Sequence, residues 1–418
     1  MPDHSGRFSI VGGGVGGLVV ARRLAASGAE VTVFEASDRL GGTVARHEVA
    51  GIGLDAAAES FAVRGGVVAA LLEELGLQDD IVAPAPGPAW LQPMSGDPLP
   101  LPATALLGIP ADPLADDVVR VVGGTAAARA VELDARAVEG VPGTLGALVR
   151  ARYGDAVLDR LVAPVVHGVH SQHPDELPVA RAHPGLADAV REAGSLGAAV
   201  ARLRAAAPPG AAVAGIRGGL HRIVPALADD LARRGGDVRF NAHIDDLSRL
   251  DGTVVVAAPG VAAPAPPGRR IDLITLVVEQ DELDAAPRGT GLLVAAGAPL
   301  GARALTHATA KWEWLRQAAG GRHVIRLSYD RTPSDPVAAA RADAETLLGV
   351  RLPTVVGAAH VWWMRPGAAS IPPPGVTLVG ETVAGSGLAG IVAHAERTAS
   401  DLLRPHLVVE RAERDETQ

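Results

Sequence analysis

The sequence predicts an α/β fold in which one parallel sheet is assembled from separate parts of the chain. Strand, glycine-turn and acid signals occur together in three places, and we expect these to form one discontinuous domain from residues 1–80, 208–268 and 355–406. The stretches between them differ. Residues 81–207 indicate helices, and residues 269–354 indicate strands of a second, mostly antiparallel sheet, while residues 407–418 are a charged tail. The expected fold is therefore a Rossmann-like domain joined to a second part made of helices and a mixed sheet.

Residues 8–35 show the pattern most completely. An apolar run typical of a buried parallel strand leads into Gly-X-Gly-X-X-Gly at Gly12, Gly14 and Gly17, and a helix follows. In such a turn Gly12 permits the tight bend, Gly14 lets the backbone approach a pyrophosphate, and Gly17 lets helix and strand pack closely. A second strand ends at Glu35, whose carboxylate can accept hydrogen bonds from ribose hydroxyls. This combination predicts a dinucleotide site.

The residues after Glu35 distinguish between dinucleotides. They read Glu35-Ala-Ser-Asp-Arg39-Leu-Gly41-Gly42, which resembles the FAD-binding signature of the amine-oxidase and protoporphyrinogen-oxidase superfamily. The resemblance implies that Arg39 and the backbone of Gly41 and Gly42 add a second set of contacts to FAD. We therefore favour FAD over NAD. We expect it to be bound non-covalently, because a chain without cysteine lacks one route to covalent attachment.

The composition narrows the classes of protein to consider. The chain has 418 residues, 48% of them hydrophobic, and a formal net charge of −9, which suits a globular enzyme and argues against a nucleic-acid partner. The lack of cysteine excludes disulfides, thiolate metal sites and a cysteine nucleophile, and we expect no metal site. We find neither a signal peptide nor a transmembrane stretch, so we expect a cytoplasmic protein. The sequence leaves open whether the protein contacts a membrane surface and whether it forms a homodimer.

Most of the chain resembles the bacterial protoporphyrinogen/coproporphyrinogen III oxidase family of heme biosynthesis. The landmarks that carry this resemblance are residues 58–64, 152–170, 174–177, 217–220, 311–312 and 324–331. It implies an oxidase that converts coproporphyrinogen III to coproporphyrin III, or protoporphyrinogen IX to protoporphyrin IX, with dioxygen as the acceptor. We favour coproporphyrinogen III, because the chain has no long apolar helix and no net positive charge to draw it to anionic lipid.

We expect the domain made of residues 1–80, 208–268 and 355–406 to bind FAD, and residues 81–207 and 269–354 to form the substrate domain. The resemblance also implies FAD contacts along several segments. Ala56–Ala58 are expected either to let the backbone lie against a flat cofactor ring, because they are small, or to be ordinary alanine-rich packing. The helix that starts near Gly387 would direct its positive end at the flavin, where negative charge builds on reduction. Glu381, at the end of a strand, is expected either to hold the ribityl chain or to be a solvated acid. The full set of expected contacts is Gly12, Gly13, Gly14, Val15, Gly16, Gly17, Glu35, Ala36, Arg39, Gly41, Gly42, Ala57, Ala58, Glu59, Ser60, Ile244, Trp363, Glu381, Ser386, Gly387 and Leu388.

Three cations are candidates for binding the carboxylates of a tetrapyrrole substrate: Arg46, Arg64 and Lys311, the only lysine. Arginine forks bind carboxylates well, yet each of these residues is more simply interpreted as a surface cation. We assign no catalytic residue, because the growing aromaticity of the product lowers the demand for a general base. His167 and His170 share a helix face, but two histidines alone make a poor metal site.

Two departures from the family keep alternatives open. Only Met364–Gly375 separates Trp363 from the last expected strand, where the family has a longer segment, and the final loop reads Gly385-Ser-Gly-Leu-Ala-Gly. Both lie near the expected flavin. The alternatives are an amine-oxidase-like flavoenzyme acting on another substrate, and a non-catalytic relative that binds FAD or a porphyrin.

Overall fold

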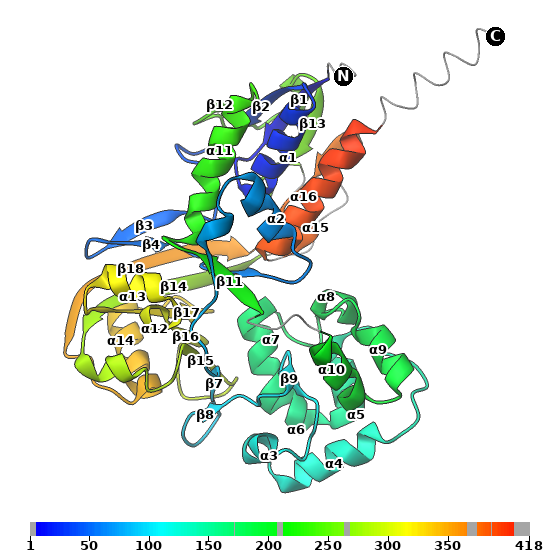
Figure 1. Ribbon diagram of the computed structural model, residues 1–418, viewed down its shortest axis with the longest axis vertical. Helices are drawn as coiled ribbons and strands as arrows, with labels where there is room; N and C mark the ends of the chain where they lie inside the picture. Colours follow the sequence, from blue (N-terminus) through cyan, green and yellow to red (C-terminus); the bar gives the residue numbers. More distant parts are fainter. Residues whose placement is uncertain are drawn as a thin grey trace. The chain divides into compact units, whose positions relative to one another are not determined.

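The computed structural model describes residues 6–170, 172–206, 212–262, 268–365, 374–385 and 387–404 (Figure 1). They form two compact units. Unit 1 takes its described residues from Met1–Pro84, Ala211–Ile271 and Val361–Gln418, and unit 2 from Ala85–Gly210 and Asp272–His360. The assignment of one part of the chain to FAD and the other to substrate stays a prediction. No helix within the described ranges is long and apolar enough to cross a membrane.

Unit 1 is built on a five-stranded parallel sheet, which confirms the α/β fold expected from the sequence. The strand order is β12-β2-β1-β13-β19, and every neighbouring pair is parallel. The strands are β1 (Arg7–Val11), β2 (Glu30–Phe34), β12 (Asp237–Arg239), β13 (Thr253–Val256) and β19 (Val376–Leu378). Four of the five residues of β1 are buried, Ser9 among them, as the largely apolar run predicts for a strand covered on both faces.

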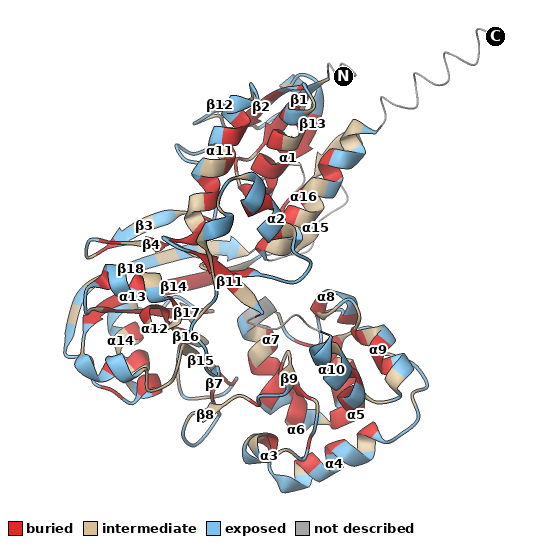
Figure 2. Ribbon diagram, in the orientation of Figure 1, coloured by how far each residue is buried: buried red, intermediate tan, exposed pale blue. Residues whose placement is uncertain are grey.

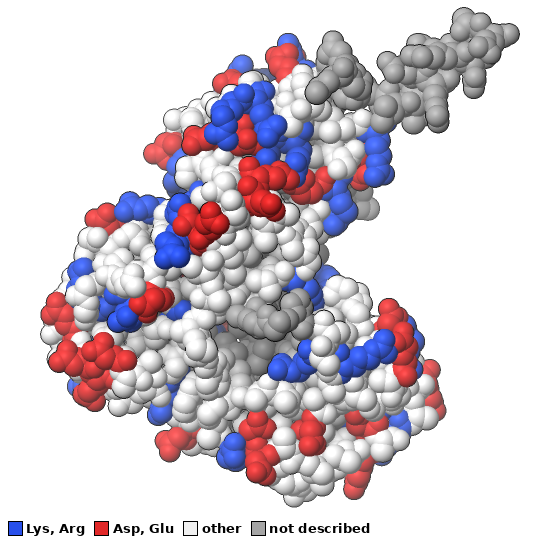
Figure 3. Space-filling model, in the orientation of Figure 1, with Lys and Arg blue, Asp and Glu red and all other residues white. Residues whose placement is uncertain are grey.

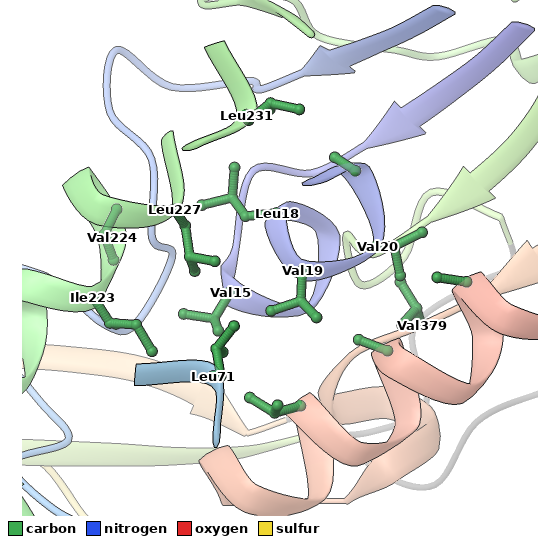
Figure 4. Close-up of a cluster of buried hydrophobic side chains, with 14 of the residues drawn as sticks. Val15, Leu18, Val19, Val20, Leu71, Ile223, Val224, Leu227, Leu231 and Val379 are labelled. Carbon is green, nitrogen blue, oxygen red and sulfur yellow. The ribbon is translucent and has the colours of Figure 1, made fainter. Parts of the chain in front are cut away.

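Four helices supply most of the remaining core of unit 1. They are α1 (Val15–Ala26), α2 (Val67–Glu74), α11 (Ile223–Arg233) and α16 (Leu388–Leu403). Helix α1 is central, and ten of its twelve residues are buried (Figure 2). In the close-up of this core, Leu18 of α1 lies beside Leu227 of α11, and Val20 of α1 lies beside Val379 (Figure 4). Full burial of each such side chain contributes roughly 1.5–3 kcal/mol.

Smaller strands complete unit 1. An antiparallel hairpin joins β3 (Arg46–Val49) to β4 (Ile52–Asp55). A three-stranded antiparallel sheet has the order β5 (Phe61–Ala62), β11 (Val213–Ile216) and β6 (Ile81–Val82). Gly215 and Ile216 of β11 pair with Val82 and Ile81 of β6. The remaining short turns are η1 (Gln78–Asp80), η3 (Leu220–Arg222), η4 (Leu247–Arg249) and α15 (Glu381–Ala384).

A charge network that the sequence did not reveal ties three helices of unit 1 together. Arg22 of α1 is buried, with 1% of its surface exposed. Its Nε donates to Asp230 of α11 at 2.7 Å, and its Nη1 donates to Glu74 of α2 at 2.8 Å. Asp230 also accepts from Arg234 at 2.8 Å, and despite its burial these arginines lower the pKa of Asp230 to about 2. The network therefore keeps a buried guanidinium paired on both sides.

We predict that Arg22→Met destabilises the protein by about 3 kcal/mol, because it leaves the buried Asp230 carboxylate with less compensation. Equilibrium unfolding in urea measures this. Arg23→Met is the matched control: Arg23 also pairs with Glu74, but a third of its side chain is exposed, so its loss should cost less. Equal losses for both variants would contradict the prediction.

The helical part of unit 2 packs around a core of its own. Its helices are α3 (Asp116–Val122), α4 (Gly124–Asp134), α5 (Leu145–Tyr153), α6 (Asp155–Val157), η2 (Leu158–Val162), α7 (Ala163–His170), α8 (Val179–Ala182), α9 (Leu186–Ala193) and α10 (Leu196–Ala205). Helices α3 and α4 are separated at Gly123, and α5 and α6 at Gly154. Gly123 and Gly154 take φ values of 85° and 81°, which interrupt helical geometry.

The second sheet has seven strands in the order β18-β14-β17-β16-β15-β7-β8. They are β18 (Thr354–Arg365), β14 (Arg269–Glu279), β17 (His323–Tyr329), β16 (Ala304–His307), β15 (Gly291–Val294), β7 (Trp90–Gln92) and β8 (Leu99–Pro100). The pairings of β14, β16 and β17 are antiparallel, whereas β7 and β15 are parallel, so the sheet is mixed, as expected. The sequence did not indicate β18. Other elements here are β9 (Ala105–Leu106), β10 (Ile109–Pro110), η5 (Asp281–Ala285), α12 (Ala308–Lys311), α13 (Glu313–Ala319) and α14 (Pro336–Leu348).

Two buried histidines face each other across β16 and β17. The distance from His307 Nε2 to His323 Nδ1 is 3.1 Å, and 1% of His307 is exposed. Burial, with a smaller effect of His323, lowers the pKa of His307 to about 3. Below the unfolded-state pKa of about 6.5, the unfolded chain therefore binds a proton that the folded chain does not, and folding stability falls as the pH falls toward 3.

We predict that this histidine alone removes about 2 kcal/mol of stability between pH 7 and pH 5. Thermal unfolding of the full chain at a series of pH values measures the loss. The control is His307→Gln, whose amide can still bond His323 but does not titrate. Its stability should fall less steeply over the same range, and parallel curves for the two proteins would exclude the buried imidazole as the cause.

Candidate cofactor site

The glycines of the first turn are mostly explained by the protein's own packing. A Cβ atom on Gly17 would lie 2.1 Å from the carbonyl oxygen of Gly12, and one on Gly13 would lie 2.3 Å from Leu40. Gly12 has a φ of 105°, and a Cβ there would lie 2.8 Å from the amide nitrogen of Ala258. Side chains at these three positions would collide with neighbouring parts of unit 1.

Gly14 is different, because its own surroundings do not require glycine. A Cβ there would have no atom within 4 Å, and its φ of −68° suits any residue. Gly14 is the N-cap of α1, and no side chain caps the helix. The first N–H groups of a helix have no partner within it and carry partial positive charge. Open space beside an uncapped helix start is what a phosphate needs.

Glu35 holds the end of β2 against this turn. Its Oε2 accepts from the backbone N–H of Gly13 at 2.8 Å, and its Oε1 accepts from the backbone N–H and hydroxyl of Ser37 at 2.9 and 2.7 Å. The carboxylate is thus fixed beside the glycine turn by three donors. Ala36 is exposed on the same loop.

The second glycine motif lies directly on the first. The N–H of Gly41 donates to the carbonyl oxygen of Gly13 at 2.8 Å, and a Cβ on Gly42 would lie 3.7 Å from the Cα of Gly14. Arg39 donates from Nη1 to the carbonyl oxygen of Gly42 at 3.0 Å, which holds the loop closed. Two motifs separated in sequence therefore lie against each other, and their sharing of one ligand stays a prediction.

The third part of the candidate site comes from the C-terminal segment. The backbone of Gly380 lies against α1, since a Cβ on Gly16 would be 3.1 Å from the Cα of Gly380. Glu381 follows as the first residue of α15, and Gly387, with a φ of 110°, is the N-cap of α16. Leu388 begins α16 and is buried. Ser386 lies outside the described residues.

Glu381 is not the solvated acid that was one of its two interpretations. Its Oε1 lies 3.3 Å from Nε of Arg365, and only 22% of each side chain is exposed. Burial raises the pKa of Glu381, while Arg365 opposes that rise. The sequence gave no signal for Arg365, because its partner is brought to it only by the fold.

The remaining expected contacts lie on three further segments. Ala57 is half-buried and Ala58 exposed in the turn after β4, with Glu59 and Ser60 half-buried beyond them. The side chain of Ile244 packs against the apolar cluster formed by β1 and β13. Trp363 is half-buried on β18.

Asp55, which the sequence did not single out, joins the end of β4, two residues before Ala57, to the start of η3. Its buried carboxylate accepts from the backbone N–H groups of Leu220 and His221 at 2.9 and 2.8 Å, and lies 2.8 Å from Nδ1 of His221. Like Glu35, Asp55 ends a strand, and that placement is the signal that could have revealed it.

The three candidate cations have different surroundings. Arg46 is exposed and lies 3.4 Å from Glu48, and Lys311 lies 5.0 Å from the ring centroid of Trp312. Arg64 is exposed, and it has no hydrogen bond or ion pair to any residue that the structure describes. Arginine and acidic side chains are interspersed over the face shown in Figure 3, so exposure alone does not mark a substrate contact. Arg46 and Arg64 belong to unit 1 and Lys311 to unit 2.

The described residues include only part of what the sequence led us to consider for histidines and metal ions. His167 packs edge-on against His173, with ring centroids 6.1 Å apart, and the side chain of His170 lies outside the described part. Within the described residues there is no group of three or more His, Cys, Asp or Glu side chains arranged to hold a metal ion.

Comparison with known proteins identifies the family. Residues 15–261 match the model of a family described as flavin containing amine oxidoreductase. The chain belongs to this family. Coproporphyrinogen III oxidase of Mycobacterium leprae is 30% identical, with 81% of this chain and 80% of that protein covered. The protein of the same name from Mycobacterium tuberculosis is 29% identical, with 95% of this chain and 97% of that protein covered.

A solved structure shows the same fold over nearly the whole chain. It is a protein from Exiguobacterium sp. 255-15, provisionally named a protoporphyrinogen oxidase, with a TM-score of 0.81 and 24% identity, and the match covers 96% of this chain and 99% of that one. The comparisons confirm the family resemblance seen in the sequence: this is an FAD-dependent oxidoreductase of the porphyrinogen oxidase group.

We predict that Gly14→Asp abolishes FAD binding and leaves the FAD-free protein folded. Aspartate is a favourable N-cap with no clash at this position, yet its carboxylate would occupy and repel the place of a pyrophosphate. Flavin content after purification and the melting temperature of the FAD-free protein measure the two effects. Gly17→Ala is the contrasting variant, in which folding itself should suffer. A yellow, fully loaded Gly14→Asp protein would refute the placement of the pyrophosphate.

Proposed function

We propose that this protein oxidises coproporphyrinogen III to coproporphyrin III, using FAD and passing the electrons to dioxygen, in the cytoplasm. The observation that carries the proposal is the match to coproporphyrinogen III oxidases along 95% of the chain, through the helical part and the second sheet as well as the FAD motifs. A shared cofactor motif alone would not extend that far. The formal net charge of −9 also favours a substrate that is met away from anionic lipid.

The described residues of unit 1 fit FAD. In the proposal, the start of α1 and the open space at Gly14 receive the pyrophosphate, and Glu35 accepts hydrogen bonds from a ribose. The backbone of Gly41 and Gly42 extends the same surface, and Glu381 lies where the third segment reaches the edge of the sheet. When bound, FAD supplies the two-electron acceptor for the reaction.

The chain's own contribution is to bind, orient and stabilise. Aromatising a porphyrinogen removes six electrons, so each substrate molecule requires three two-electron rounds at the same site. The positive ends of α1 and α16 favour negative charge on whatever lies before them, which assists charge that develops during each round. We assign no general base, because aromatisation drives the loss of the pyrrole protons.

The experiment that tests the proposal is an aerobic assay of the FAD-loaded protein with coproporphyrinogen III and with protoporphyrinogen IX, read by porphyrin fluorescence. We expect faster turnover of coproporphyrinogen III. Faster turnover of protoporphyrinogen IX would overturn the substrate choice. A loaded protein that is inert toward both would favour an amine-oxidase-like enzyme or a binding protein, as the short connection between Trp363 and β19 suggests.

We predict that Arg64→Ala raises the KM for the porphyrinogen tenfold or more and leaves FAD content unchanged, because one charge-assisted contact to a propionate is worth about 1.5–3 kcal/mol. Steady-state kinetics measures this. Arg7→Ala is the control: Arg7 is also exposed, but it pairs with Glu30 at the amino end of β1, opposite the glycine turn. An unchanged KM for Arg64→Ala would remove this residue from the substrate site.

A further inference from the structure

The turn that carries Glu381 belongs to the same edge of the sheet as the glycine motifs. The N–H of Val379 donates to the carbonyl oxygen of Val256 at 3.0 Å, which continues the pairing of β19 with β13. Gly380 has a φ of 94° and lies against Gly16 in the first turn of α1. This backbone contact fixes the position of the chain just before Glu381. A side chain on Gly380 would be strained and one on Gly16 would be crowded, so the contact depends on both glycines.

The charged groups around Glu381 are few. Arg365, at the end of β18, is its ion-pair partner, and Arg269, at the start of β14, lies close enough to Arg365 to lower the pKa of that guanidinium. The first turns of α1 and α16, which border the same turn, consist of uncharged residues. Among the described residues, the carboxylate thus takes its electrostatic support chiefly from one arginine.

Burial acts on both members of this pair in the direction that would neutralise them. It raises the pKa of Glu381 and lowers that of Arg365, and the attraction between the two opposes both shifts. An isolated carboxylate at this depth would bind a proton more readily as the pH falls. The arginine therefore favours the charged form of Glu381.

We propose that Arg365 is a positioning residue for the cofactor: it keeps the Glu381 carboxylate ionised and in place to accept hydrogen bonds from the hydroxyl groups of the ribityl chain. This inference rests on the proposed binding of FAD along this edge, and it extends that proposal to a residue outside the sequence motifs. A carboxylate accepts hydrogen bonds from hydroxyls more strongly than a neutral carboxyl group does. Arg365 acts on FAD through Glu381 and not by contacting FAD itself.

The test measures the dissociation constant of FAD between pH 6 and pH 9, by quenching of flavin fluorescence, without any porphyrinogen. Wild-type protein should show an almost flat profile. Glu381→Gln should bind FAD about tenfold more weakly at every pH. Arg365→Gln should bind like wild type at pH 9 and lose affinity about tenfold toward pH 6, as the unsupported carboxylate takes up a proton. Arg365→Lys should restore most of the flat profile.

Two comparisons separate this role from a merely structural one. The double variant Glu381→Gln with Arg365→Gln should bind FAD as Glu381→Gln does, because Arg365 acts only through that carboxylate; this comparison holds even if Arg365→Gln alone does not fold. Arg270→Gln is the matched control. It removes a neighbouring charge that lies over Trp362, 4.4 Å from the ring centroid, and should leave the profile flat.

A double variant weaker than Glu381→Gln, or a flat profile for a folded Arg365→Gln protein, would overturn the inference. Because the readout is FAD binding alone, a protein that fails to oxidise porphyrinogens would reject the proposed substrate and leave this inference standing.

Discussion

The close approach of helix α1 to the turn that precedes it is the constraint on which unit 1 depends. Only a hydrogen atom fits between the Cα of Gly17 and the carbonyl oxygen of Gly12, since a Cβ would lie 2.1 Å from that oxygen. This contact lowers α1 onto β1 and β13 and brings its uncapped first turn to the carboxyl ends of the strands. Three other parts of the candidate site contact this turn or the start of α1: Glu35 through Gly13, Gly41 through Gly13, and Gly380 through Gly16.

Helix α1 also needs packing partners on its remaining faces. Its apolar residues meet α11 and α16, but its C-terminal half carries Arg22 into the interior, where Asp230 and Glu74 neutralise it. Such a network is costly to break and adds little net stability over an apolar core. Its geometric effect is clearer: the fork of one arginine joins α2 and α11 at a set distance from α1, so the core has one arrangement of these helices.

The features that could be predicted from the sequence are those set by interactions between residues close together in the chain. The glycine turn, the strand before it and the acid at the end of β2 are set within about thirty residues by backbone geometry, and those features were found. The pairing of Arg22 with Asp230, the capping of Leu220 by Asp55 and the pairing of Arg365 with Glu381 join residues that no local pattern connects.

The roles of the glycines show how the structure separates fold from function within a single motif. Gly12 and Gly17 are required by neighbouring backbone atoms, and any protein with this turn would need glycine there whether or not it bound a ligand. Gly14 faces open space, and a Cβ on Gly42 would lie in ordinary contact with the Cα of Gly14, at 3.7 Å. A motif match alone gives all of these positions equal weight. The geometry instead points to Gly14 as the position that serves a ligand. The packing of the protein itself does not require glycine there, and Gly14 stands at a helix end that no side chain caps.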